Sequence, residues 1–87
     1  MNNMEERRRT RIDLMAAILE ASGSGGKKTR IMYKANVNPR DHSKIMTFLI
    51  QKGLLEQVAI DGERNFQITQ KGREFVENYY RIIEALQ

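Results

Sequence analysis

Asn38–Gly53, with the sequence NPRDHSKIMTFLIQKG, carries the clearest helix signals in this chain and decides its fold. Asn38 is a preferred N-cap residue, and Pro39 suits the first helical position. Asp41 stands at the third position, where its carboxylate can reach back to the N–H of the cap residue. The pattern predicts a helix that runs to Lys52, and the glycine that follows is expected to adopt the left-handed conformation that ends helices.

This helix is expected to have two chemically different faces. The spacing of its apolar positions predicts an inward face formed by His42, Ile45, Met46 and Leu49. The opposite face is polar and basic, and is formed by Arg40, Ser43, Lys44, Thr47 and Gln51. Arg and Lys pair with guanine edges or phosphates, and Ser and Thr donate or accept where space is tight. The outward face therefore fits the major groove of a nucleic acid duplex.

The preceding sequence predicts two further helices. Arg9–Ser22 is expected to form the first, because apolar residues recur there at helical spacing, at Ile12, Met15, Ala16 and Leu19. The small residues Gly23–Gly26 end it, since they lose too much backbone entropy to continue a helix. Lys27–Ala35 is expected to form the second, with Thr29 as its candidate N-cap.

The second helix begins in a basic cluster, formed by Lys27, Lys28, Thr29 and Arg30, and Lys34 lies further along it. Free N–H groups at a helix start and nearby cations together favour a phosphate. The alternative is a charged face that only contacts water. Beside a capped third helix, the phosphate interpretation is favoured.

A change of period after the third helix predicts a β-hairpin. Leu55–Ile60 and Arg64–Ile68 are short β-type runs on either side of Asp61-Gly62, a strong signal for a tight turn. Arg64 is the candidate nucleic-acid contact of this hairpin, but the neighbouring Asp61 and Glu63 would repel phosphate. We therefore expect the hairpin to contribute little to binding.

Thr69 is expected to cap a last helix, from Gln70 to about Leu86. The order helix, helix, helix, strand, strand, helix predicts a mainly α (α+β) winged helix-turn-helix fold. Phe75, Tyr79, Ile82 and Leu86 follow the heptad spacing of a coiled coil, with Val76, Tyr80 and Ile83 beside them. A homodimer through Phe75, Tyr79, Ile82, Ile83 and Leu86 is predicted. The alternative is that this stripe folds back on the first helix.

Composition and charge agree with one small domain that binds a polyanion. Residues 1–53 carry eleven Lys and Arg against five Asp and Glu, whereas residues 54–87 carry four against six. We expect a flexible basic N-terminus at residues 1–8, a DNA-binding domain at 9–69 and a dimerisation helix at 70–87. No apolar stretch approaches a membrane span, the N-terminus is not a secretory signal, and a cytoplasmic location is expected.

Catalysis, cofactors and metals are not indicated. There is no cysteine, and the single histidine, His42, has no second histidine with which to share a metal ion. A half-buried position on the third helix is expected for it. The glycine-rich stretch before Lys27 lacks the spacing of a phosphate-binding loop. The chain is therefore expected to be no enzyme and to need no cofactor.

Three stretches resemble the small archaeal winged-helix proteins of the "ten-a" class from Sulfolobus: GGKKTRIMYKANVN (25–38), IQKGLLE (50–56) and ITQKGREFVENYYRI (68–82). The resemblance covers residues 9–86. It implies an antiparallel coiled-coil homodimer that binds double-stranded DNA as a chromatin-associated (nucleoid) or regulatory factor. It also implies a role for the basic cluster at residues 27–30 and an aromatic position at Tyr33. His42 departs from the large aliphatic residue expected there, and the helix ending at Gln87 favours a compact dimer over a long rod.

Two other functions are considered. A winged helix can serve as a protein-interaction module without binding DNA, and the acidic C-terminal half would suit that role. An RNA binder is disfavoured, because no aromatic platform for unpaired bases is apparent.

Overall fold

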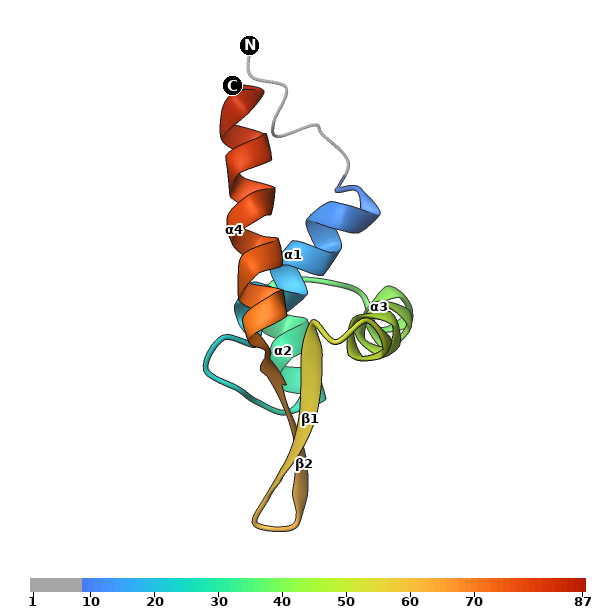
Figure 1. The fold of residues 1–87 in the computed structure, drawn as a ribbon. Helices are drawn as coiled ribbons and strands as arrows, with labels where there is room; N and C mark the ends of the chain where they lie inside the picture. The colour runs from blue at the N-terminus through green and yellow to red at the C-terminus, as the bar shows by residue number, and fades with distance from the viewer. Residues whose placement is uncertain (1–8) are drawn as a thin grey trace.

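The computed structural model describes residues 9–87, so the predicted flexible N-terminus at residues 1–8 lies outside the described residues. The order of the elements is the predicted one, and with it the winged-helix fold is confirmed. The elements are α1 (Arg11–Ala21), α2 (Lys28–Ala35), α3 (Pro39–Gln51), β1 (Leu55–Ile60), β2 (Glu63–Ile68) and α4 (Gln70–Ala85). The β-hairpin and the far end of α4 project in opposite directions from the body, as Figure 1 shows. The molecule measures 49 × 25 × 20 Å.

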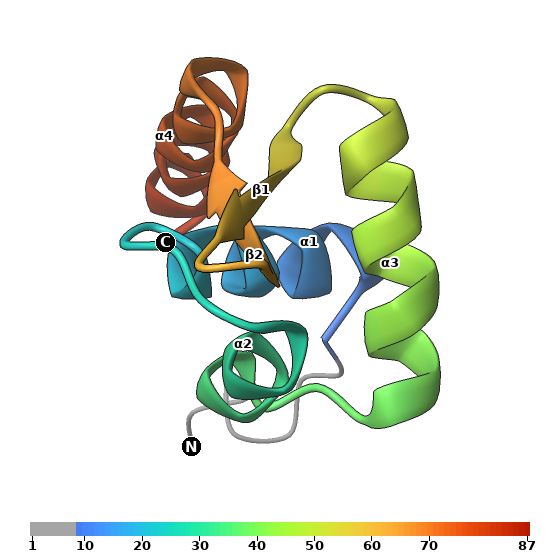
Figure 2. The same cartoon turned by 90° about the horizontal axis from the view of Figure 1, so that it is seen from below.

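The core is built around α1, which contacts α2, α3, α4 and β2. Seen from below, the hairpin lies between α3 on one side and α4 on the other (Figure 2). Ile18 and Leu19 of α1 are completely buried, and so is Leu49 of α3. The predicted inward face of α3 is confirmed, since His42, Ile45, Met46 and Leu49 are all buried. Packing of this face fixes the orientation of the opposite, polar face of α3.

The caps of α3 follow the sequence signals with one difference. The Asn38 side chain accepts a hydrogen bond from the Asp41 N–H at 2.9 Å. The Asp41 carboxylate accepts from the side-chain amide of Asn38, at 2.9 Å, instead of from its backbone. The helix ends at Gln51, one residue earlier than predicted, and Gly53 has the expected left-handed φ of 75°.

Three expectations for α1 and α2 were wrong. Thr29 does not cap α2: the helix begins at Lys28, and Lys27 occupies the cap position without a side-chain hydrogen bond. In α1, Thr10 forms a capping box with Asp13, so the helix begins at Arg11 and not at Arg9. Ile12 was expected in the core but is 55% exposed.

Arg9, which precedes α1, has a structural role. Its guanidinium donates to the carbonyl oxygens of Asn36 and Ala35, at 2.9 and 3.0 Å. These carbonyls lie at the end of α2, where helix backbone acceptors are left without partners. Arg9 therefore ties the segment before α1 to the end of α2, the helix that precedes α3.

The hairpin has the predicted tight turn. Asp61 and Gly62 both have positive φ, 52° and 77°, as a type I′ turn requires. The strands pair antiparallel, and β2 begins at Glu63, one residue earlier than expected. Gly26 also pairs with Phe66 of β2, which the sequence analysis did not predict. This bridge fixes the loop before α2 against the hairpin.

The last helix begins as predicted, since the Thr69 hydroxyl accepts from the Gly72 N–H at 3.0 Å. A Cβ at Gly72 would lie 2.2 Å from the Leu54 carbonyl oxygen, so α4 approaches the chain before β1 too closely for any side chain. Phe75 and Val76 pack against the core. No helix among residues 9–87 is long and apolar enough to cross a bilayer.

Candidate nucleic-acid interface

All ten residues predicted to contact nucleic acid are exposed: Lys27, Lys28, Thr29, Arg30, Lys34, Arg40, Ser43, Lys44, Thr47 and Arg64. They come from the start of α2, the outward face of α3 and strand β2. Exposure is necessary for contact with a duplex but does not place the side chains together.

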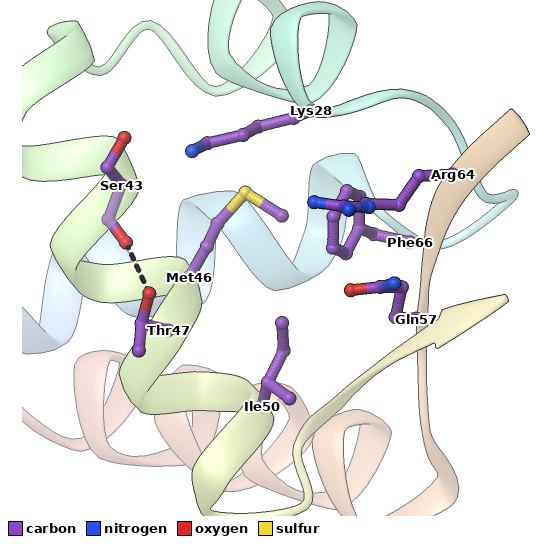
Figure 3. Close-up of a pocket in the computed structure, with 8 residues that line it drawn as sticks. All are labelled: Lys28, Ser43, Met46, Thr47, Ile50, Gln57, Arg64 and Phe66. Atoms are coloured by element: carbon purple, nitrogen blue, oxygen red, sulfur yellow. Dashed lines mark hydrogen bonds between the residues drawn. The ribbon is translucent and has the colours of Figure 1, made fainter.

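Four of the ten line one cleft between α3 and the hairpin, the α3–wing cleft (Figure 3). Lys28 and Arg64 extend over it from α2 and β2, and Ser43 and Thr47 line it from α3. The Thr47 hydroxyl donates to the Ser43 carbonyl oxygen at 3.0 Å, so its proton is committed within the helix. While this bond is kept, the hydroxyl can only accept a hydrogen bond from a ligand.

The remaining lining of this cleft was not predicted. It consists of Met46, Ile50, Gln57 and Phe66. Gln57 and Arg64 are brought to one face by the register, since Gln57 pairs with Phe66 and Ala59 with Arg64. The signal in the sequence was the alternation of β1: Gln57 is in phase with the buried Leu55, so it had to face the same side.

Lys27 is directed elsewhere. Its ammonium forms a salt bridge with the carboxylate of Glu63 on β2. Because consecutive residues of a strand point to opposite faces, Glu63 lies on the other side of the hairpin from Arg64. The Lys27 ammonium lowers the pKa of the Glu63 carboxyl, through the hydrogen bond and the charge. Of the two hairpin carboxylates expected to repel phosphate, Asp61 and Glu63, the second is thus paired and turned away from the cleft.

The other predicted contacts lie outside this cleft. Lys34 lines a separate hollow with Arg9 and Glu20. Arg40 and Lys44 are exposed on α3, and Thr29 and Arg30 are exposed at the start of α2. Their roles stay predictions.

His42 joins the two helices of the helix-turn-helix. Its ring is 1% exposed, deeper than the half-buried position expected, and its Nε2 lies 2.9 Å from the Lys28 carbonyl oxygen. A carbonyl only accepts, so Nε2 carries the proton, and the buried Nδ1 has no partner within residues 9–87. Burial lowers the pKa of His42, the hydrogen bond with the Lys28 carbonyl opposes this, and the Lys28 charge adds to the lowering. A neutral His42 therefore fixes the start of α2, and with it Lys28, against α3.

A further hollow, the α1–α4 groove, is almost entirely apolar. It has a volume of about 310 Å³ and is lined by Thr10, Ile12, Asp13, Phe75, Asn78, Tyr79, Ile82 and Ile83. The exposure of Ile12 is explained by its place here: the first turn of α1 extends beyond the core and faces α4. No cluster of three or more metal-ligating side chains occurs within residues 9–87.

The five predicted dimer residues divide between this chain's own packing and its surface. Phe75 packs against the core, and the Tyr79 hydroxyl donates to the Asp13 carboxylate of α1. Ile82 and Leu86 are 61% and 79% exposed, and Ile83 is partly buried. Nearby, the Tyr80 hydroxyl donates to Glu20 at 2.7 Å, which raises the pKa of Tyr80 to about 12. The stripe thus packs on α1 at its beginning and is open at its end.

Comparisons with known proteins agree with this architecture. The uncharacterized protein MJ0287 of Methanocaldococcus jannaschii is 29% identical over 86 residues, covering 98% of this chain and 84% of that protein. The structure is similar to that of Sso10a-2, a DNA-binding protein from Sulfolobus solfataricus, with a TM-score of 0.74 and 26% identity over 90% of this chain and 85% of that one. It shares its fold with SSV1 F-93, with a TM-score of 0.67 and 22% identity over 87% of this chain and 88% of that one.

The match with Sso10a-2 confirms the resemblance to the Sulfolobus class. A model of the family described as winged helix-turn-helix matches residues 8–87, nearly the whole sequence. The chain therefore belongs to the winged helix-turn-helix family.

Proposed function

We propose that this chain binds double-stranded DNA as a homodimer, with α3 in the major groove, and acts in the cytoplasm as a transcription regulator or a nucleoid-associated factor. The proposal assigns it no catalytic step and no cofactor. The similarity to Sso10a-2, a DNA-binding protein, supports it, since the two chains align over most of their lengths.

The observation that carries this proposal is the composition of the α3–wing cleft and its surroundings. Lys28 and Arg64 reach the same space as the polar face of α3, and no carboxylate lines it. Lys44 and Arg40 extend the positive charge along α3. A duplex carries one negative charge per about 1.7 Å of its axis, so cations spread over three elements match its backbone.

The salt dependence of binding tests this proposal. If Lys28, Arg30, Arg40, Lys44 and Arg64 each neutralise a phosphate, log K should fall with log salt with a slope of about −4 to −5 per protomer. Mobility-shift or fluorescence titrations at several salt concentrations give this slope directly. A slope near zero would contradict DNA binding and would favour the protein-interaction module.

The α1–α4 groove supports the homodimer. Ile12 and Ile82 are large apolar side chains that are more than half exposed, and Leu86 extends the same surface towards the end of α4. Apolar area of this kind is stabilised when it leaves water, by about 25 cal/mol per Å². The distal half of α4 itself is amphipathic, so the same helix from a second copy is a self-complementary occupant.

Sedimentation equilibrium of the full chain tests the dimer independently of DNA. A dimer at micromolar concentration is expected, with recognition helices about 34 Å or a multiple of this apart if both engage one face of a duplex. A monomer at tens of micromolar would contradict the dimer while leaving DNA binding by a single protomer open to the salt titration.

A further inference from the structure

The α3–wing cleft is larger than the space that one DNA phosphate would fill. Its volume is about 440 Å³, within the roughly 300–1,000 Å³ typical of small-molecule sites. A phosphate would occupy the space between the two cations and would leave the rest of the cleft unused.

The floor of the cleft is apolar. Met46 and Phe66 belong to the core, at 2% and 5% exposure, and their outer atoms form the floor (Figure 3). Ile50, at 37% exposure, adds an aliphatic side chain beside them. Because Met46 and Phe66 are held by the core, this floor exists before any ligand arrives. Hydrocarbon placed on it would leave water, which is favourable in proportion to the area buried.

The rim of the cleft is cationic and has no internal counter-charge. Lys28 and Arg64 reach over the floor from two different elements, and the only other polar side chains are those of Ser43, Thr47 and Gln57. Within residues 9–87, neither Lys28 nor Arg64 has an ion-pair partner. Glu63, the carboxylate that precedes Arg64 in β2, is paired with Lys27 on the other face of the hairpin. A ligand anion would therefore meet two uncompensated cations.

We propose that the α3–wing cleft binds a small aromatic carboxylate, with its ring on Met46, Ile50 and Phe66 and its carboxylate between Lys28 and Arg64. Gln57 supplies an amide at the edge of the ring site. Such a ligand would occupy side chains that the proposed function assigns to the duplex. The ligand would therefore release the protein from DNA. This regulatory part of the inference rests on the proposed function.

The test is a titration of the full chain, free of DNA, with 2-naphthoate, followed by amide chemical shifts. We expect saturable shifts centred on Lys28, Ser43, Gln57 and Arg64. 2-Naphthylmethanol has the same rings without the charge, and inorganic phosphate has charge without the rings; each should bind about tenfold more weakly or worse. Equal binding of the alcohol would reduce the site to an apolar hollow, and equal binding of phosphate would reduce it to an anion site; either result overturns the proposal.

Two arginine variants locate the site. Arg64→Met should weaken 2-naphthoate binding about tenfold, because one of the two cations is lost while an aliphatic side chain remains. Arg73→Met, an exposed arginine of α4 that does not line the cleft, should bind like the wild type. Equal effects of the two substitutions would overturn the placement.

A competition experiment with duplex DNA tests the regulatory part. 2-Naphthoate should lower the affinity of the wild type for a duplex, and 2-naphthylmethanol at the same concentration should not. Binding of 2-naphthoate without any loss of duplex affinity would overturn the competition. If the protein fails to bind the duplex at all, the proposed function fails, and the shift titration still decides whether the cleft takes the carboxylate.

Discussion

The α3–wing cleft and the α1–α4 groove differ in what they need from a partner. The α3–wing cleft is bordered by long charged side chains that are well solvated without one. The α1–α4 groove leaves Ile12 and Ile82 in water. Charged surfaces gain from a partner mainly through long-range attraction that salt screens, whereas apolar surfaces gain by leaving water. The two hollows should therefore respond to different substitutions and different solution conditions.

The largest effect is expected in the groove. Ile82→Glu should raise the dimer dissociation constant more than a hundredfold, since burying an uncompensated carboxylate costs about 3 kcal/mol or more. Ile82 is 61% exposed in the single chain, so the fold of the protomer should survive. Sedimentation equilibrium measures the dissociation constant, and circular dichroism checks the fold.

Arg81→Glu is the matched control for this variant. It introduces a carboxylate at the neighbouring exposed position, which does not line the groove, and it lowers the net charge by two units where Ile82→Glu lowers it by one. A similar loss of the dimer in both variants would mean that added negative charge on α4, and not the groove, decides association.

The second prediction divides the cationic face into positioning and reading residues. Lys28→Ala should weaken binding to all duplexes about equally, because phosphate contacts carry no base information. If Arg40 and Lys44 contact base edges, their side chains favour the preferred sequence. Arg40→Ala and Lys44→Ala should then each reduce the difference in binding free energy between preferred and random duplexes by about 1–3 kcal/mol. Titrations on selected and random duplexes measure both quantities. If all three variants lose affinity equally on selected and random duplexes, the protein binds DNA without sequence preference, which favours a chromatin role.

How far the sequence could predict these two hollows depends on the range of the signals. The elements were predictable because their signals are local: Asn38 and Pro39 for α3, Asp61-Gly62 for the turn, Thr69 for α4. The buried face of α3 followed from its period alone. These signals act within a few residues and need no knowledge of the tertiary structure.

The contacts between distant elements were not predictable. The salt bridge of Lys27 joins the loop before α2 to β2. The sequence predicted a phosphate contact for Lys27 and did not predict this salt bridge. Gly26 pairs with Phe66, and the Arg9 guanidinium caps the end of α2 at Asn36, 27 residues later in the sequence. Ile12 fitted the apolar period of α1, but the first turn of that helix extends beyond the core. The spacing of apolar residues along a helix shows which of them lie on the same face. It does not show whether another element covers that face.

A third prediction concerns pH and the joint between α2 and α3. Because burial lowers the pKa of His42 below its ordinary value of 6.5, the unfolded chain takes up this proton more readily than the folded one. His42 should therefore contribute its full stability above pH 6.5 and lose it as the pH falls below that value. The loss cannot exceed about 1.4 kcal/mol per pH unit for one proton.

His42→Gln separates this effect from the titration of carboxylates. Glutamine retains an N–H that can donate to the Lys28 carbonyl oxygen, but it does not titrate. Urea unfolding should give a free energy that falls less steeply below pH 6.5 in the variant than in the wild type. Identical pH slopes would mean that His42 keeps an ordinary pKa in the folded chain.

The smallest effect is expected at the hairpin, where Glu63→Gln should raise duplex affinity a few-fold. The substitution removes a carboxylate from the wing and also frees the Lys27 ammonium, which can then approach a phosphate. The salt slope should become steeper by up to about 0.9 per protomer, the value for one additional phosphate contact.

Glu56→Gln is the matched control, because Glu56 is an exposed carboxylate of the same hairpin for which the structure shows no ion pair with residues 9–87. It changes the net charge equally but frees no cation, so its salt slope should equal that of the wild type. If the two variants gain affinity and slope equally, the wing acts through its net charge alone, and Lys27 plays no part in contact with the duplex.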